Sequence, residues 1–308
     1  MSDKVFLFPG QGSQSVGMGR DLYDAFGSVK KVFDDAQNIL GFDIKKYCFE
    51  GPLEDLTKTD IVQPAITLLN IALFTLLKEH GVSPSVVCGH SLGEYSAVFA
   101  AGVLDLSTVL KLVQKRGKYM QKAADKNPGS MIAVVGLPRE KVEELVADGL
   151  SSGAVGIANF NTQEQLIVSG VSEAVSYVSE QVEKLEGVRV IPLNVSGPWH
   201  SSLMQEARQR MVEELDLCEF SNPTVPIICN VTAEYATDGE MVKRNLIEQI
   251  TGSVRWYETV KRLEKDYQGA QYLEVGPGRV LKGLVRSINR SLDVTNVGNV
   301  MTLKSFEH

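Results

Sequence analysis

The sequence predicts an α/β protein, in which a hydrolase-like large domain with a mainly parallel sheet carries an inserted ferredoxin-like (βαββαβ) subdomain. Two observations lead to this prediction. Short apolar runs alternate with stretches of helical periodicity along the 308 residues. In the middle of the chain the order changes to strand, helix, strand, strand, helix, strand. We expect residues 1–127 and 194–308 to form the large domain and residues 128–193 to form the subdomain.

The large domain is expected to be built around short buried strands. Each strand is an apolar run of four or five residues that polar or turn-forming residues bound, and helices fill the intervals. The expected strands are Lys4–Phe8, Ser85–Cys88, Pro226–Asn230 and Gln271–Glu274.

The inserted subdomain is predicted from the order of its elements and from the punctuation around them. Asn127-Pro128-Gly129 precedes it and Pro192 follows it, and both are typical of hinges. A cleft between two such bodies is a common position for an active site. The expected elements are Met131–Val135, Arg139–Asp148, Ala154–Asn159, Gln165–Ser169, Ser172–Lys184 and Val188–Ile191.

Composition narrows the class of protein. The net charge of −7 and the lack of a Lys- or Arg-rich run argue against a nucleic-acid partner. The longest apolar stretch, Ile66 to Leu77, is shorter than the roughly twenty residues of a membrane span, and the run before Pro9 is too short for a signal peptide. The four cysteines have neither metal-type nor redox spacing. We therefore expect a cytoplasmic protein with reduced thiols, no metal and no bound cofactor.

The first candidate for chemistry is Ser91. The apolar run before it leads into Gly89-His90-Ser91-Leu92-Gly93, and a helix-compatible stretch follows. This is the pattern of a nucleophile elbow, a sharp strand-to-helix turn that exposes a serine hydroxyl. Glycines flank the serine because the turn is tight and the backbone passes close to its neighbours.

A serine nucleophile needs a base, and the chain has four histidines. His308 is terminal, His80 looks like a helix end, and the turn is expected to direct His90 away from the serine. His200 remains, in a loop just after the predicted subdomain, either as the base or as a structural histidine. Since no Asp or Glu stands out as a triad acid, we expect a Ser–His dyad whose imidazole a backbone carbonyl orients.

Arg116 lies on the wrong face of its predicted helix, Asp105 to Lys122. By spacing it belongs to the buried stripe with Val113 and Met120, whereas the lysines of this helix line the opposite face. A buried guanidinium is costly unless an anion pairs with it, and its planar fork matches a carboxylate. The partner is either an internal Asp or Glu or a free carboxylate on the substrate's acyl group.

The N-terminal strand ends in the glycine turn Pro9-Gly10-Gln11-Gly12-Ser13. It is not a dinucleotide fingerprint, because Ser15 stands where the third glycine is required. A turn at the carboxyl end of a strand can direct a backbone N–H at the reaction centre. The N–H groups of Gln11 and Leu92 are therefore our candidates for an oxyanion hole.

Motifs in one order along nearly the whole chain resemble the malonyl-CoA:acyl carrier protein transacylase family of bacterial type II fatty acid synthesis. They are Phe8-Pro9-Gly10-Gln11-Gly12-Ser13-Gln14, Gln63-Pro64-Ala65, Gly89-His90-Ser91-Leu92-Gly93-Glu94, Arg116-Gly117 with Met120-Gln121, Gln249 ahead of Val254-Arg255-Trp256, and Glu274-Val275-Gly276-Pro277-Gly278.

The resemblance implies a malonyl-serine intermediate on Ser91, with His200 as general base and Arg116 on the malonyl carboxylate. Gln11 and Leu92 would supply the oxyanion-hole amides, and malonyl-CoA and acyl carrier protein would be the substrates. It also implies that the Gln249 carbonyl orients His200.

The resemblance further implies that Gln63 lines the acyl pocket. The histidine loop departs from the commonest pattern of the family at Gly197 and Trp199. The bulk of Trp199 favours malonyl over methylmalonyl. We expect a monomer.

An acidic carrier protein requires a local basic patch on this acidic enzyme. Basic residues recur at helical spacing after Gly278, and they form either a docking face or an ordinary solvated face. They are Arg279, Lys282, Arg286 and Arg290, of which Lys282 and Arg286 are the central candidates.

Three alternative functions remain open. A freestanding acyltransferase of a polyketide synthase would share the chemistry and differ in its carrier. A serine hydrolase or thioesterase would share the elbow and release the acid to water, against which Arg116 and the missing triad acid weigh. A non-catalytic docking subunit is disfavoured because Ser91, His200 and Arg116 are all present.

Overall fold

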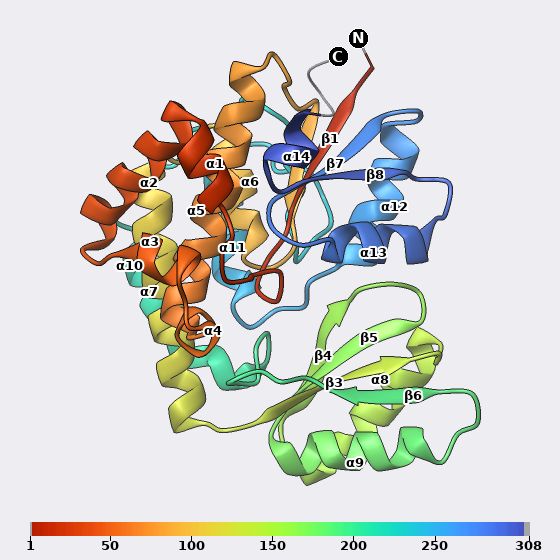
Figure 1. The fold of residues 1–308 in the computed structure, drawn as a ribbon. Helices are drawn as coiled ribbons and strands as arrows, with labels where there is room; N and C mark the ends of the chain where they lie inside the picture. The colour runs from red at the N-terminus through yellow and green to blue at the C-terminus, as the bar shows by residue number, and fades with distance from the viewer. Residues whose placement is uncertain (1, 305–308) are drawn as a thin grey trace.

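The computed structural model describes residues 2–304 and contains two separate sheets (Figure 1); His308 lies outside these residues. The first sheet is fully parallel, in the order β2, β1, β7, β8. Its strands are β1 (Lys4–Phe8), β2 (Val86–Gly89), β7 (Gln271–Val275) and β8 (Val294–Val297).

Helices cover both faces of the parallel sheet. Alternate residues of a strand point to opposite faces, so Val5 and Leu7 pack in one hydrophobic cluster while Phe6 and Phe8 pack in the other. The larger cluster includes the long buried helix α5 (Thr59–Glu79), and the smaller one includes α12 (Trp256–Asp266) and α13 (Val280–Ile288). The sheet is therefore buried on both sides, as parallel sheets usually are.

The remaining helices connect these strands. They are α1 (Arg20–Ala25), α2 (Gly27–Leu40), α3 (Ile44–Phe49), α4 (Leu53–Leu56), α6 (Gly93–Ala100), α7 (Leu106–Lys126), α10 (Gln205–Leu215), α11 (Gly239–Gln249) and α14 (Val300–Leu303), with a 3-10 turn at Ser202–Met204. A second 3-10 turn, Leu150–Ser152, lies in the segment that forms the antiparallel sheet.

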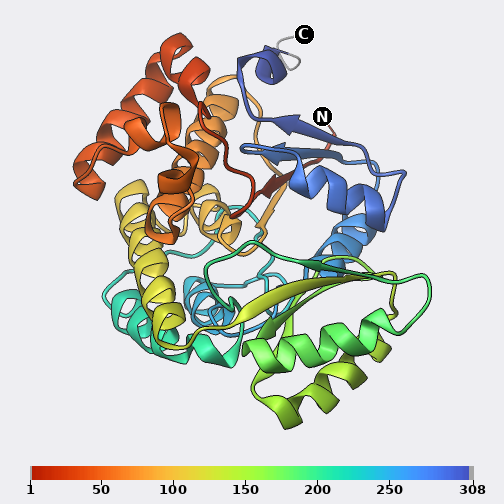
Figure 2. The same ribbon diagram turned by 60° about the horizontal axis from the view of Figure 1, so that its bottom comes forward.

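The second sheet is antiparallel, and we refer to it with its helices as the antiparallel unit (residues 130–192). Its strand order is β4, β5, β3, β6. Figure 2 shows both helices on the outer side of this sheet, and their apolar residues form a third hydrophobic cluster with it. The elements are β3 (Ser130–Val135), α8 (Arg139–Gly149), β4 (Val155–Phe160), β5 (Gln165–Gly170), α9 (Ser172–Glu183) and β6 (Arg189–Pro192).

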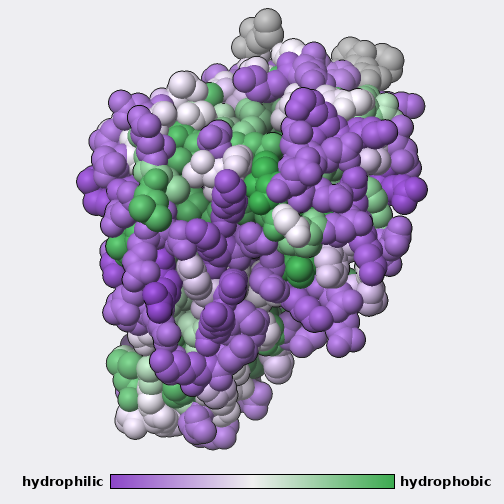
Figure 3. Space-filling view, turned by 90° about the vertical axis from the view of Figure 1, so that its left-hand side faces the viewer, coloured by the Kyte–Doolittle hydropathy of each residue, from purple (hydrophilic) through white to green (hydrophobic). Residues whose placement is uncertain are grey.

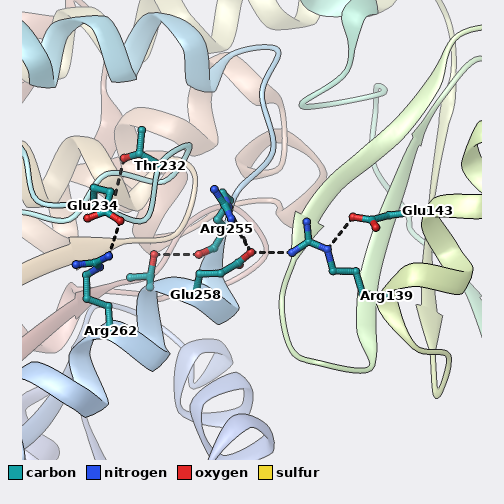
Figure 4. Close-up of polar contacts among 8 residues, drawn as sticks. Arg139, Glu143, Thr232, Glu234, Arg255, Glu258 and Arg262 are labelled. Carbon is teal, nitrogen blue, oxygen red and sulfur yellow. Dashed lines mark hydrogen bonds and ion pairs between the residues drawn. The ribbon is translucent and has the colours of Figure 1, made fainter.

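Hydrogen bonds and an ion-pair network join the antiparallel unit to the start of α12. The Phe160 amide donates to the Val254 carbonyl at 2.9 Å. Arg139 on α8 pairs with Glu258 on α12 at 2.8 Å and with Glu143 at 2.7 Å, as Figure 4 shows. Arg139 also lies 4.1 Å above the Phe160 ring. Together these contacts hold one edge of the antiparallel unit against the start of α12.

The order of strands and helices expected for the antiparallel unit is confirmed, with bounds that differ by one residue at most. The strand expected at Pro226–Asn230 is wrong, since only isolated bridges form there. Ile228 bonds to β2 through the Val87 carbonyl, but Ile227 already accepts from Ala236 in a turn back. Because the hydrogen bonds of this segment are divided between β2 and the turn, no continuous ladder of strand hydrogen bonds forms there. Strand β8 was missed because Thr295 and Asn296 interrupt its short apolar pattern.

Helix α5 is long and apolar enough to cross a membrane by length and composition, but 83% of its most apolar window is buried inside the fold. It is therefore accounted for as a core helix. The face seen in Figure 3 is largely hydrophilic, with hydrophobic side chains gathered in its upper middle. All four cysteines are free, and three of them are buried.

Candidate active site

Ser91 stands at a tight turn between β2 and α6. Its φ of 49° lies in the left-handed region, which a residue with a side chain rarely adopts. The flanking glycines are required by close backbone approach. A Cβ at Gly89 would lie 2.0 Å from the carbonyl carbon of Gly93, and one at Gly93 would lie 2.0 Å from the Phe8 carbonyl oxygen. The expected elbow geometry is therefore present, and it raises the Ser91 hydroxyl above the carboxyl end of the sheet.

His200 is the histidine that reaches Ser91. Its Nε2 lies 2.7 Å from Ser91 Oγ, and its Nδ1 lies 2.8 Å from the Gln249 carbonyl oxygen. Because a carbonyl can only accept, Nδ1 carries the proton, and the neutral ring accepts from the Ser91 hydroxyl at Nε2. His90, by contrast, lies 2.9 Å from Asn161 Oδ1.

Burial, and after it the charge of Arg116, lowers the pKa of His200 to about 3. The imidazole is therefore neutral at physiological pH. A neutral ring beside a serine hydroxyl can take the hydroxyl proton, which a protonated ring cannot do.

The Arg116 side chain, on α7, also approaches the Ser91 hydroxyl. It is 1% exposed, as the spacing predicted, and Asp105 caps the helix by accepting from the Thr108 amide at 2.7 Å. Its Nη1 donates to Gln63 Oε1 at 2.9 Å and its Nη2 donates to Gln249 Oε1 at 2.8 Å. Nη2 also lies 3.4 Å from Ser91 Oγ.

The internal salt bridge left open for Arg116 is not found among the described residues, because its partners are the oxygens of neutral amides. Burial lowers the pKa of Arg116, although Tyr95 and Glu94 act in the opposite direction. An arginine nevertheless stays protonated in proteins. The site thus contains a buried cation whose remaining guanidinium N–H groups could bind a carboxylate.

A cavity of about 140 Å³ joins these groups. Gln11 and Leu92 line it, and within residues 2–304 neither backbone N–H is engaged in a hydrogen bond. Trp199 lines it too and is only 7% exposed. The antiparallel unit contributes Met131 and Asn159. The cavity therefore lies between the two sheets, as expected for a cleft.

The structure does not bring the predicted docking residues into this cavity. They lie on and beside α13, with Arg279, Arg286 and Arg290 exposed and Lys282 half-buried. The start of α13 adjoins the glycine turn of the N-terminal strand, because a Cβ at Gly278 would lie 3.2 Å from the Ser13 carbonyl oxygen.

Two buried polar residues of the site were missed as contributors. Glu94 accepts hydrogen bonds from the side chain of Gln249 and, at 3.1 Å, from the backbone N–H of Asn230. Asn230 Oδ1 in turn accepts from the Ser91 amide at 2.6 Å. Burial raises the pKa of Glu94 to about 7, although these hydrogen bonds lower it. The apolar neighbours of Glu94 at helical spacing were the one available signal, since they place a carboxylate inside the fold.

Within the described part of the chain no group of three or more His, Cys, Asp or Glu residues is arranged to hold a metal ion. The polar groups gathered around Ser91 are instead suited to acid–base work, to hydrogen bonding or to binding an anion.

Comparison with known proteins adds a second line of evidence. An acyl transferase domain family matches residues 5–303. The malonyl CoA-acyl carrier protein transacylase of Bacillus subtilis (strain 168) is 39% identical over 305 residues, 99% of this chain and 96% of that protein. The polyketide biosynthesis malonyl CoA-acyl carrier protein transacylase of the same organism is 39% identical over 291 residues, 94% and 98% of the two chains.

Among solved structures, a malonyl-transacylase in complex with the holo acyl-carrier protein of a type II PKS is 37% identical, with a TM-score of 0.94 over 99% of both chains. The likeness in fold thus extends over nearly the whole chain, both sheets included.

Proposed function

The chain belongs to the malonyl CoA-acyl carrier protein transacylase family of acyl transferase domains, and from that premise we propose that it transfers malonyl from malonyl-CoA to the phosphopantetheine thiol of an acyl carrier protein. The observation that carries the proposal is Arg116, buried and bonded to two neutral amides beside the Ser91–His200 pair. An acyl group that ends in a carboxylate fits this arrangement.

In the first half-reaction His200 Nε2 takes the Ser91 proton while Oγ attacks the thioester carbonyl carbon. The amides of Gln11 and Leu92 stabilise the negative oxygen that forms. The intermediate collapses, the carbon–sulfur bond breaks, and His200 returns the proton to the leaving thiolate of coenzyme A. The product is malonyl-Ser91.

In the second half-reaction His200 takes the proton of the carrier's thiol, and the sulfur attacks the malonyl ester. Collapse of this intermediate breaks the bond to Ser91 Oγ, which recovers its proton from His200. The Gln249 carbonyl holds the ring in one tautomer throughout, since it accepts from Nδ1. No carboxylate is needed in that position.

Selectivity for malonyl rests on two features of the cavity. Arg116, held by Gln63 and Gln249, is positioned to bind the carboxylate through the hydrogens that these amides leave free. The volume of about 140 Å³ and the buried Trp199 leave little space for an α-methyl group. Malonyl is therefore favoured over methylmalonyl.

We also infer the organisation of the whole protein. Residues 1–127 and 194–308 form a hydrolase-like domain and residues 128–193 a ferredoxin-like insert, which the strand order β4, β5, β3, β6 with both helices on one face supports. Free and mostly buried cysteines support a reducing cytoplasmic location. The protein acts as a monomer without a bound cofactor, and the carrier docks on Lys282 and Arg286.

A second candidate is delivery to a polyketide carrier. The polyketide relative of Bacillus subtilis is as similar in sequence, at 39% identity, as the transacylase of that organism that is not named for polyketide synthesis. The chemistry at Ser91 is the same in both cases. Comparing transfer rates to a fatty acid carrier and a polyketide carrier separates the two.

Transfer to a holo carrier protein tests the proposed activity. Malonyl-CoA and carrier are mixed with the enzyme, and the mass of the carrier is followed. We expect malonyl-carrier to appear with the wild type and to fall to background with Ser91→Ala. Release of free malonate without malonyl-carrier would indicate a hydrolase, and no turnover at all would indicate a non-catalytic protein.

A further inference from the structure

Glu94 is a buried carboxylate to which the mechanism above assigns no role. It lies in the first turn of α6, three residues after Ser91, and it is 0% exposed. A buried carboxylate usually pairs with a cation, yet the ion pairs of the described residues do not include Glu94. Its oxygens instead accept hydrogen bonds from two neutral residues, Asn230 and Gln249.

Both partners of Glu94 bind the backbone of Ser91. Gln249 Nε2 donates to the Ser91 carbonyl at 2.9 Å, and Asn230 Oδ1 accepts from the Ser91 amide at 2.6 Å. Asn230 Nδ2 also donates to the Gly89 carbonyl at 2.6 Å. The carboxylate therefore connects the Gln249 side chain with the backbone N–H of Asn230, and the side chains of these two residues hold the elbow.

The Gln249 amide has a defined orientation because of these contacts. Its nitrogen faces two acceptors, Glu94 and the Ser91 carbonyl, and its oxygen faces the Arg116 guanidinium at 2.8 Å. Rotating the amide by half a turn would place its nitrogen against the arginine and its oxygen against two acceptors. The acceptors at Glu94 and at the Ser91 carbonyl thus together determine which end of Gln249 meets Arg116.

We propose that Glu94 is a positioning residue for acyl-group recognition: through Gln249 it fixes the direction of the Arg116 fork relative to Ser91. This inference rests on the proposed function. Glu94 touches neither substrate nor reacting atom, and its effect falls on the binding of the acyl carboxylate. The polarised chain from Glu94 through Gln249 to Arg116 also strengthens the hydrogen bond that holds the guanidinium.

The isosteric variant Glu94→Gln distinguishes a positioning role of Glu94 from a merely structural one. Both oxygens of Glu94 face donors, so a glutamine satisfies one of them and turns its own NH₂ toward the other. If that NH₂ faces Gln249, the amide of Gln249 is driven to rotate and to present its nitrogen to Arg116. Glu94→Asp keeps two accepting oxygens and moves them about one carbon–carbon bond length, roughly 1.5 Å, away from Gln249.

The test compares malonyl-CoA, acetyl-CoA and p-nitrophenyl acetate at pH 8, above the pKa of about 7 that burial gives Glu94. We expect Glu94→Gln to raise the KM for malonyl-CoA at least tenfold and to lower the malonyl-to-acetyl preference by the same factor. Acylation by p-nitrophenyl acetate, which needs Ser91 and His200 but no carboxylate site, should stay within twofold. Glu94→Asp should lose about threefold in preference.

A merely structural Glu94 would lower all three activities together, and that result would overturn the proposal. An unchanged malonyl preference in folded Glu94→Gln would also overturn it. Should that variant not fold, Glu94→Asp decides alone, because wild-type preference there contradicts the proposal. Glu213→Gln, on the exposed surface of α10, is the matched control and should behave as wild type.

A double variant tests the route of the effect. In an Arg116→Ala background, Glu94→Gln should change the malonyl-to-acetyl ratio no further, because residues in one network are not additive. An additional loss of ratio would show that Glu94 does not act through Arg116. If the wild type itself shows no malonyl preference, the proposed function fails, whereas a wild-type preference that Glu94→Gln leaves intact contradicts this inference alone.

Discussion

Arg116→Ala provides the strongest prediction of selectivity. The guanidinium is buried, two of its hydrogens are held by Gln63 and Gln249, and the hydrogens not used there are available to the substrate. Removing one partner of a buried, hydrogen-bonded charge pair costs roughly 2–5 kcal/mol, or about 30- to several-thousand-fold in kcat/KM. We expect a malonyl-CoA loss in that range.

Acetyl-CoA provides the comparison, because it lacks the carboxylate. In the wild type an acetyl group leaves the Arg116 charge buried without an anion, which disfavours it. Arg116→Ala removes that penalty, so acetyl transfer should stay constant or rise. Arg116→Lys keeps the charge without the planar fork, and it should fall between the two for malonyl.

The assay is kcat/KM for both thioesters with a holo carrier, together with a thermal melt of each variant. Lys118→Ala, on the exposed face of the same helix, is the matched control and should leave both values unchanged. An equal loss of malonyl and acetyl transfer in folded Arg116→Ala would contradict a role for Arg116 in binding the acyl carboxylate. Arg116 would then be a structural residue.

Three further predictions follow from backbone, charge and burial. Gly93→Ala should destabilise the fold by about 3 kcal/mol or more in a denaturant melt, because its Cβ would lie 2.0 Å from a β1 carbonyl oxygen. In the unfolded state His200 becomes protonated below about pH 6.5, whereas in the folded state, where its pKa is about 3, it stays neutral until much lower pH. Stability should therefore fall with pH below 6.5, by about 3 kcal/mol from this group at pH 4. Lys282→Glu with Arg286→Glu should raise the KM for the carrier about tenfold and leave that for malonyl-CoA unchanged.

Matched variants separate these effects from general damage. Gly27→Ala, where a Cβ meets nothing within 4 Å, should cost little stability. His200→Gln should show a flatter loss of stability between pH 6.5 and 4, and an unchanged slope would contradict the assigned burial effect. Lys30→Glu with Lys31→Glu, on the exposed surface of α2, should not alter the KM for the carrier. If both charge reversals raised the KM for the carrier equally, α13 would not be a specific docking face.

The sequence predicted those parts of the site that local pattern determines. The elbow at Ser91 follows from adjacent glycines, and the burial of Arg116 follows from helical spacing. The role of Glu94 could not be predicted, because it depends on Gln249, which lies 155 positions away. The strand expected at Pro226–Asn230 was wrong for a related reason. Its apolar residues are buried as expected, but a turn back through Ala236 takes the hydrogen bonds of a ladder, and only the tertiary fold reveals that competition.

Covalent transfer through Ser91 can be seen in the intact mass of the protein after brief exposure to malonyl-CoA without a carrier. We expect an increase by one malonyl group in the wild type, no increase in Ser91→Ala, and loss of the adduct when holo carrier is added. An unmodified wild type that steadily releases malonate would contradict it, as would an adduct that persists in Ser91→Ala.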